Sequence, residues 1–110
     1  MTKEQVIAII KEAAQRHGFT TCKYSMTRLI EIKEPGETHF LNFTIWERLA
    51  PDTDWSRCEV TMNLHFCASL ACMGGEPTPE DLLLASDIIR RGAELVKELE
   101  AMSLSYTERH

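Results

Sequence analysis

Residues 57–66 alternate strictly between polar and apolar side chains. The apolar parity consists of Cys58, Val60, Met62, Leu64 and Phe66. Successive side chains of a strand point to opposite faces of a sheet, so the pattern predicts a strand with one face in the core. We therefore expect Val60, Met62, Leu64 and Phe66 to be buried beneath helices.

Two earlier segments predict a β-hairpin. Residues 21–33 alternate in the same way, with Arg28 as an exception to the parity, and residues 39–46 return as a second strand. Between them, Glu34-Pro35-Gly36-Glu37 has proline and glycine at the two central positions that a type II turn favours. Residues 47–56, which include Trp55, are expected to form a loop.

Helices are predicted at both ends of the chain. Thr2 and Gln5 have the spacing of a capping box, apolar residues then recur at helical spacing, and Gly18 is a suitable end for a helix over residues 3–17. A second helix begins after Thr78 and Pro79 and continues to about Met102.

Gly92 interrupts the apolar stripe of the second helix. Because glycine costs about 1 kcal/mol relative to alanine within a helix, we expect it to permit a close approach, to Ala13 and Ala14 of the first helix.

The order of elements predicts an α+β fold, α-β-β-β-α, in which a three-stranded antiparallel meander has both helices on one face. The chain is long enough for a single core. We expect residues 1–102 to form one α+β domain and residues 103–110 to be a frayed polar tail.

This order of elements resembles that of the double-stranded RNA-binding domain. Pro35-Gly36 in the first hairpin turn, and His39 followed four positions later by Phe43, are similar to residues of that family. The family opens its second helix with lysines that bind phosphate groups, whereas this chain has Thr78-Pro79-Glu80-Asp81. Because acidic residues repel phosphates, we infer shared geometry without shared function and transfer no site residue.

The face of the sheet opposite the helices is the candidate interaction surface. Its expected members are Leu29, Phe40, Asn42, Trp46, Glu59, Thr61, Asn63 and His65. Leu29, Phe40 and Trp46 would form an apolar patch there, which implies burial against another chain or a ligand. The alternative left open is that residues 47–56 fold under the sheet and cover the patch with Trp55.

Charge and cysteine content narrow the class of protein. A net charge of −5, with basic residues dispersed along the chain, argues against nucleic acid as a partner. No apolar run is long enough to span a bilayer, and the polar segment after Met1 differs from a secretory signal. The four cysteines are then expected to be reduced thiols, and we expect a cytoplasmic protein without membrane contact.

No residue pattern indicates catalysis or a cofactor. His65, Cys67 and Cys72 lack the paired spacing of a zinc site, and Asp52 and Asp54 lack the distal glutamate of a calcium loop. The same histidine and cysteines lack an orienting third residue for nucleophilic catalysis. We therefore expect no catalytic residue, no metal and no cofactor.

Two functions remain as hypotheses. The first is a non-enzymatic protein-interaction module, such as a small acidic inhibitor, adaptor or chaperone-like protein, that acts as a homodimer. Residues 57–66 would be an edge strand blunted only by Arg57 and Glu59, and such an edge favours pairing with another chain. The alternative is a small-molecule binder or modest enzyme that uses the polar sheet face, where His65 lies near Glu59.

Overall fold

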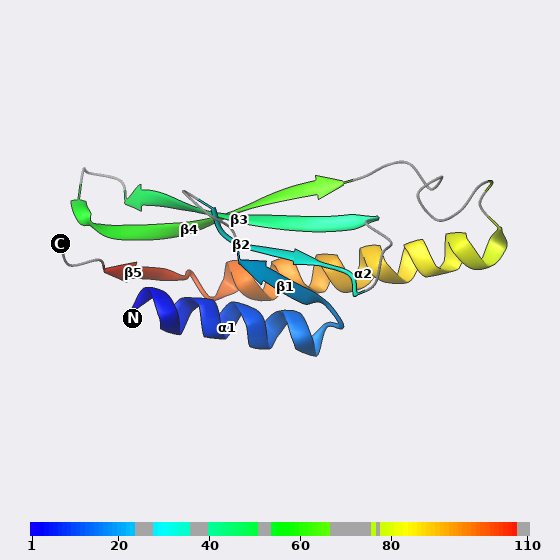
Figure 1. The fold of residues 1–110 in the computed structure, drawn as a ribbon, viewed down its shortest axis with the longest axis horizontal. Helices are drawn as coiled ribbons and strands as arrows, with labels where there is room; N and C mark the ends of the chain where they lie inside the picture. The colour runs from blue at the N-terminus through cyan, green and yellow to red at the C-terminus, as the bar shows by residue number, and fades with distance from the viewer. Residues whose placement is uncertain (24–27, 36–39, 51–53, 67–75, 77, 108–110) are drawn as a thin grey trace.

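The computed structural model describes residues 1–23, 28–35, 40–50, 54–66, 76 and 78–107. Its elements are α1 (Lys3–Arg16), β1 (Thr20–Lys23), β2 (Arg28–Lys33), β3 (Leu41–Ala50), β4 (Asp54–Phe66), α2 (Pro79–Ala101) and β5 (Ser105–Thr107). The strands form one antiparallel sheet in the order β1-β2-β3-β4-β5 (Figure 1). The protein is therefore a small, single-domain α+β protein.

The expected three-stranded meander is wrong, because the sheet has five strands. The first predicted strand is divided into β1 and β2, which pair with each other so that Thr21 lies opposite Ile32. The expected loop over residues 47–56 is mostly strand, since β3 continues to Ala50 and β4 begins at Asp54. The end of the chain supplies the fifth strand, so the topology also differs from that of the double-stranded RNA-binding domain.

A β-bulge in β2 accounts for the irregular parity near Arg28. Arg28 lies opposite Trp46 and Ile30 lies opposite Ile45, so Leu29 is an extra residue on β2. A bulge changes which face the following side chains occupy. Leu29 and Ile30 are both buried for this reason, although they are adjacent in a strand.

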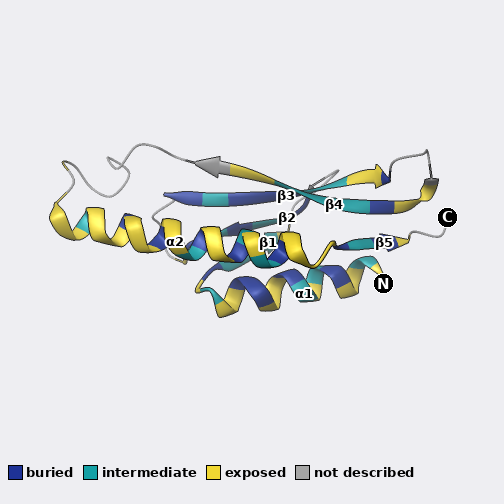
Figure 2. Cartoon of the chain, turned by 180° about the vertical axis from the view of Figure 1, so that it is seen from behind, coloured by how far each residue is buried: buried dark blue, intermediate teal, exposed yellow. Residues whose placement is uncertain are grey.

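The sheet curls into a half-barrel around the core, and the two helices close its open side. Figures 1 and 2 show β1 and β2 on one side of the molecule, α2 on the other, and α1 below them. Helix α1 contacts both edge strands, β1 and β5, as well as α2. Helix α2 lies on β3, and the core is formed mainly by apolar side chains of the helices and of β2 and β3.

Gly92 sets the distance between α2 and β3. A Cβ atom at this position would lie 2.6 Å from Leu41 Cδ2 and 2.8 Å from Phe43 Cζ. The expectation of a close approach was therefore correct, but its partner is the sheet and not Ala13 and Ala14 of α1.

Both helix starts are confirmed. The Thr2 hydroxyl accepts from the Gln5 amide at 3.2 Å, and the Thr2 amide donates to Gln5 Oε1 at 2.8 Å. Thr78 and Asp81 form the same reciprocal pair at the start of α2. At the other end of α1, Gly18 has a φ of 81°, a conformation that glycine adopts without strain.

The C-terminal residues correct a second expectation. Residues 103–107 are not frayed, because β5 pairs with β4 and Tyr106 is buried in the core. The Thr107 amide donates to the Met1 carbonyl at 3.4 Å, and Lys3 Nζ lies 2.6 Å from Glu47 Oε1. Burial, and then the nearby Glu47 carboxylate, raise the pKa of Tyr106, so its phenol stays protonated.

Candidate binding groove

The apolar patch expected on the open face of the sheet does not exist. Leu29 is 4% exposed and Phe40 is 3% exposed, and both belong to the core. Trp46 is only half-buried. Trp55 is not a lid over this face, because it lies on β4 and is 70% exposed.

The remaining residues of the expected surface lie on one face of β3 and β4, since the register places Trp46 opposite Thr61 and Thr44 opposite Asn63. Asn42, Glu59 and Thr61 are half-buried, while Asn63 is exposed. His65 lies opposite Asn42 in the register of β3 and β4, but its side chain is outside the described part of the structure. Cys67, Cys72 and Asp52, which were weighed as metal ligands, also lie outside the described residues.

The edge of β4 beyond β5 has no strand partner among the described residues. β5 pairs only with Arg57, Cys58 and Glu59, and the Val60 amide then donates to the Leu104 carbonyl at 3.3 Å. Backbone groups of alternate residues on an antiparallel strand point to the same neighbour. The N–H and C=O groups of Met62, Leu64 and Phe66 therefore point away from β3, towards the open edge.

Leu64 has the expected parity but not the expected burial. It lies directly opposite Phe43, so the two side chains share the face that carries the helices. However, α2 packs on β3 and leaves β4 largely uncovered, so Leu64 is 59% exposed. Val60 and Met62 are half-buried, and the side chain of Phe66 is not described. The prediction of a buried Leu64 is wrong for this reason.

An apolar cavity of about 360 Å³ lies between this edge and α2. We call it the β4 groove. Its floor is Leu41 and Phe43, one wall is Leu64, and the other wall is α2. The helix contributes Ile89, Gly92, Ala93, Val96, Lys97 and Glu100. The absence of a Cβ atom at Gly92 lets α2 approach β3 closely, so that β3 forms the floor of the groove.

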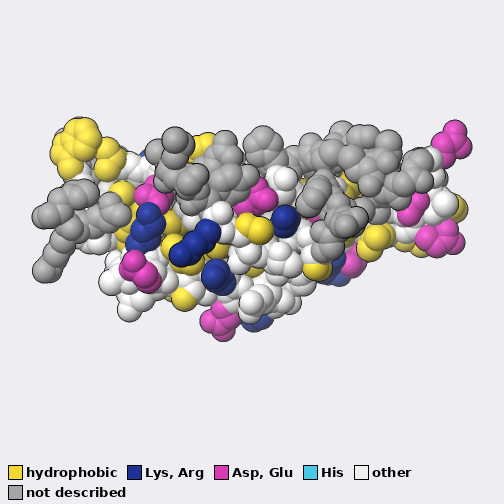
Figure 3. Space-filling model, viewed as in Figure 1, with side chains coloured by type: hydrophobic (Ala, Val, Ile, Leu, Met, Phe, Trp, Pro, Cys, Tyr) yellow, Lys and Arg dark blue, Asp and Glu magenta, His cyan; other side chains and the backbone are white. Residues whose placement is uncertain are grey.

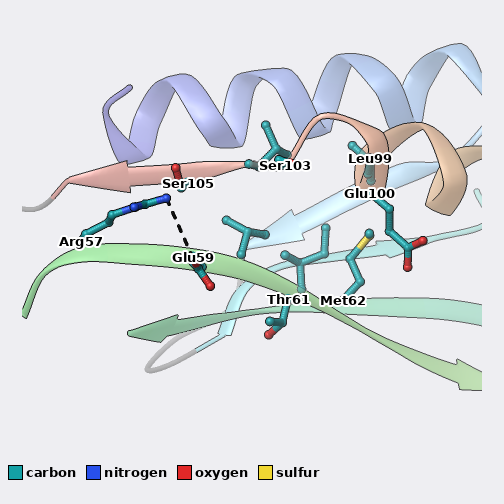
Figure 4. A pocket seen from close by; sticks show the side chains of 11 residues that line it. Arg57, Glu59, Thr61, Met62, Leu99, Glu100, Ser103 and Ser105 are labelled. Atoms are coloured by element: carbon teal, nitrogen blue, oxygen red, sulfur yellow. Dashed lines mark ion pairs between the residues drawn. The ribbon is translucent and has the colours of Figure 1, made fainter. Parts of the chain in front are cut away.

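A second, more polar cavity of about 470 Å³ continues along the same gap towards β5. It is lined by Ile45, Arg57, Glu59, Val60, Thr61, Met62, Leu99, Glu100, Ser103, Leu104 and Ser105. Figure 4 shows Met62 directed from β4 towards Leu99 and Glu100, while Thr61 points to the other side of the strand. Glu59 Oε1 lies 4.0 Å from Arg57, and its other oxygen accepts from Arg48 at 3.2 Å.

The apolar side chains of α2 are not confined to its buried face, because a flank of the helix beside the groove is apolar as well. Leu82, Ile89 and Val96 are seven residues apart and so form a stripe along one flank of the helix. Ile89 and Val96 line the groove, which shows that the stripe faces β4. Leu82 and Ile89 are exposed, and Figure 2 shows the first turns of α2 extending past the strands.

Hydrophobic side chains also gather at the end of the molecule where β3 ends and β4 begins, as Figure 3 shows. The exposed apolar residues of these strand ends are Leu49 and Trp55. Neither residue lines the β4 groove, so they do not extend it.

A hydrogen bond and a cation–π contact of Arg91 hold α2 against the end of α1, on the side away from the groove. Arg91 donates to the His17 carbonyl at 2.8 Å and lies 5.1 Å from the centre of the Phe19 ring. Hydrogen bonds from Arg90 and then Arg91 lower the pKa of Asp87. Arg91 is partly buried at this contact, whereas Arg90 is exposed.

The sequence contained a signal for this site that was not used. Leu82, Leu83 and Leu84 are consecutive, and a helix cannot direct three consecutive side chains to one face. At least one must be exposed or covered by something other than the core. The spacing of seven residues between Leu82, Ile89 and Val96 is a second signal of an apolar flank on this helix.

No protein-family model matches the chain, and neither the curated proteins nor the solved structures compared with it gave a match. Among the residues that the structure describes, no group of three His, Cys, Asp or Glu side chains could hold a metal ion. The helices in the described ranges include none that is long and apolar enough to cross a membrane.

Proposed function

We propose that the chain is a non-enzymatic protein-interaction module whose binding site is the open edge of β4 together with the β4 groove. The observation that carries this proposal is the coincidence of two features that have no partner among the residues that the structure describes. The outward backbone groups of Met62 and Leu64 lie beside an apolar cavity lined by Leu64, Ile89 and Val96.

An extended polypeptide satisfies both features at once. Its backbone pairs with the edge of β4, in line with β5, while every second side chain enters the groove between β4 and α2. This is the addition of a strand to a sheet edge, in which backbone hydrogen bonds give affinity and pockets for alternate side chains give selectivity. The class of inhibitor, adaptor or chaperone-like protein is consistent with such a site.

The unpaired part of β4 also lacks the features that protect an edge from pairing. Natural edge strands are protected by lysine, proline, a bulge or an inward-pointing charge. Residues 61–66 contain none of the four charged residue types and no proline. Arg57 and Glu59 lie where β5 already pairs, so they do not protect the open part of the edge.

A labelled peptide tests the proposal. The probe is an eight-residue peptide of alternating leucine and threonine, flanked by lysines for solubility and carrying fluorescein. The matched control carries an N-methyl group on each leucine, which removes the backbone donors that would face β4 and keeps every side chain. We expect fluorescence anisotropy to give at least tenfold tighter binding for the first peptide.

A charged variant locates the binding site. Leu64→Lys should weaken binding of the alternating peptide at least tenfold, whereas Leu83→Lys, at a 72% exposed position, should leave it unchanged. Equal binding of the two peptides, or no effect of Leu64→Lys, contradicts the proposed site.

A second candidate is a binder of small polar molecules. The cavity of about 470 Å³ beside β5 favours it, because its size is typical of ligand pockets and it contains Arg57, Glu59, Ser103 and Ser105. A thermal-shift screen over nucleotides, sugars and amino acids tests this function. A rise in melting temperature that is lost on Arg57→Gln supports it.

A further inference from the structure

We infer that the partner at the β4 edge is a second copy of this chain, so that two β4 strands pair antiparallel around a two-fold axis close to residues 63 and 64. This inference rests on the proposed function, since it uses the same edge and groove and adds the identity of the occupant. It joins the two five-stranded sheets into one continuous sheet.

The geometry of β4 is self-complementary. The open edge exposes the N–H and C=O groups of Met62, Leu64 and Phe66, all on one side of the strand. A strand that meets its own copy in the antiparallel direction presents the same groups to the same groups, as a two-fold interface requires. Because β4 is already an extended strand, pairing orders little additional backbone.

The open part of β4 is free of charge where the two copies meet. Each chain has a net charge of −5, so two copies repel each other at long range, and like charges at the contact would add to this repulsion. Residues 61–66 are Thr, Met, Asn, Leu, His and Phe, and the groove beside them is mostly apolar. Arg57 and Glu59 form an ion pair with each other. They lie beside β5, away from the two-fold axis.

The α2 stripe supplies the second half of the contact. A two-fold axis perpendicular to the sheet puts both α2 helices on the same face, antiparallel to each other. Helix α2 lies over β3, so three strand spacings, about 14 Å, separate the two helices, more than the distance of about 8–10 Å between directly packed helices. Ile89 and Val96 of both copies then face the gap between the helices, where the two Leu64 side chains lie.

The exposed surface of one copy matches what a dimer requires. The chain exposes 7075 Å², which is about 900 Å² more than the roughly 6,200 Å² typical of a compact protein of its mass. A standard stable interface covers about 800 Å² on each partner. The excess is therefore of the size that one such interface hides.

Sedimentation velocity over a wide concentration range, combined with two charged variants, tests the inference. We expect a monomer–dimer equilibrium in the wild-type chain. Leu64→Lys on the edge and Ile89→Glu on the stripe should each raise the dissociation constant at least tenfold, and both replace exposed side chains, so the monomer should stay folded. Leu83→Glu is the matched control, because Leu83 is more exposed but lies on another side of α2.

The outcomes distinguish an error in the identity of the partner from an error in the location of the binding site. A chain that stays monomeric at the highest concentration, yet binds the alternating peptide, overturns the second copy as partner and leaves the proposed function intact. A dimer that neither variant weakens also overturns the inference, because it must use another surface. If one variant fails to fold, as judged by circular dichroism, the other still decides.

Discussion

At the scale of single residues, the contact of one side chain, or the lack of one atom, determines the shape of the candidate site. Gly92 is the clearest case, because its missing Cβ lets α2 approach Leu41 and Phe43 closely. The same two side chains form the floor of the β4 groove. A change at Gly92 therefore affects both the stability of the fold and the shape of the groove.

We expect Gly92→Ala to destabilise the protein. The methyl group would lie less than 3 Å from Leu41 and Phe43, and overpacking of this kind costs about 1–3 kcal/mol. The gain in helix propensity, about 1 kcal/mol, offsets only part of that cost. Urea denaturation measures the difference, with Ser86→Ala on an exposed position of α2 as the control for propensity. A Gly92→Ala protein more stable than the wild type would show that α2 does not pack on β3 in this way.

Glu98 makes stability depend on pH at the contact between the helices. Hydrogen bonds from His17 and then Arg16 lower the pKa of Glu98 below its usual 4.5. A lowered carboxylate pKa stabilises the folded state above pH 4.5, and this contribution is lost as the pH falls through the folded-state value. Glu98→Gln should therefore lose less stability than the wild type between pH 6 and about pH 3.

Denaturation midpoints across this pH range check the expectation. Glu12→Gln, at an exposed position of α1, controls for the loss of one negative charge. If Glu98→Gln and the wild type lose stability in parallel through the acid range, the ion pairs of Glu98 do not stabilise the fold.

Among the elements, β5 differs most from what its sequence suggests. The segment of residues 103–110 is short and mostly polar, so its sequence does not clearly predict a strand. Even so, Leu104 and Tyr106 are buried, and β5 pairs with β4. The element depends on a tertiary contact, because three residues of strand are stable only beside a strand that is already formed.

Loss of β5 should destabilise the whole domain. Tyr106→Ala removes a ring that is fully buried, and large-to-small changes of aromatic core residues cost about 3–5 kcal/mol. Tyr106→Phe keeps the ring and is the matched control. Urea denaturation measures both variants together with a chain that ends at Met102. A chain ending at Met102 that is as stable as the full chain would mean that β5 is not part of the fold.

The helices and the strand parity could be predicted from the sequence because local patterns specify them. Thr2 with Gln5 and Thr78 with Asp81 form capping boxes at the predicted starts, and the alternation in β4 assigns Leu64 to the face of Phe43. The division of residues 20–33 into β1 and β2 could not be predicted, because both halves have strand propensity and the bulge at Leu29 depends on pairing with β3.

The candidate site could be predicted only in part. The unprotected edge of β4 followed from its length and its uncharged residues. The groove did not follow, because it depends on which strand α2 covers, and the pattern of apolar residues does not distinguish β3 from β4. Leu29 and Phe40 were assigned to an exposed face because the parity of a strand does not reveal a bulge or an irregular residue before the next strand.

The whole molecule is elongated, and its shape leads to the central claim. Its dimensions are 51 × 23 × 22 Å, and its radius of gyration is 15.6 Å, against about 13 Å for a compact chain of the same length. Helix α2 extends past the strands, and the edge of β4 is open beside it (Figures 1 and 2). Both features leave apolar surface and backbone groups for a partner, which supports an interaction function.

Amide hydrogen exchange along β4 tests this claim most directly. Because backbone groups alternate, the amides of Thr61 and Asn63 bond to β3, while those of Met62 and Leu64 point to the open edge. At low protein concentration we expect protection at Thr61 and Asn63 and rapid exchange at Met62 and Leu64. At high concentration, or with saturating alternating peptide, Met62 and Leu64 should become protected as well. Protection of Met62 and Leu64 in the dilute, unliganded chain would contradict the account, because the edge would already be paired within a single molecule.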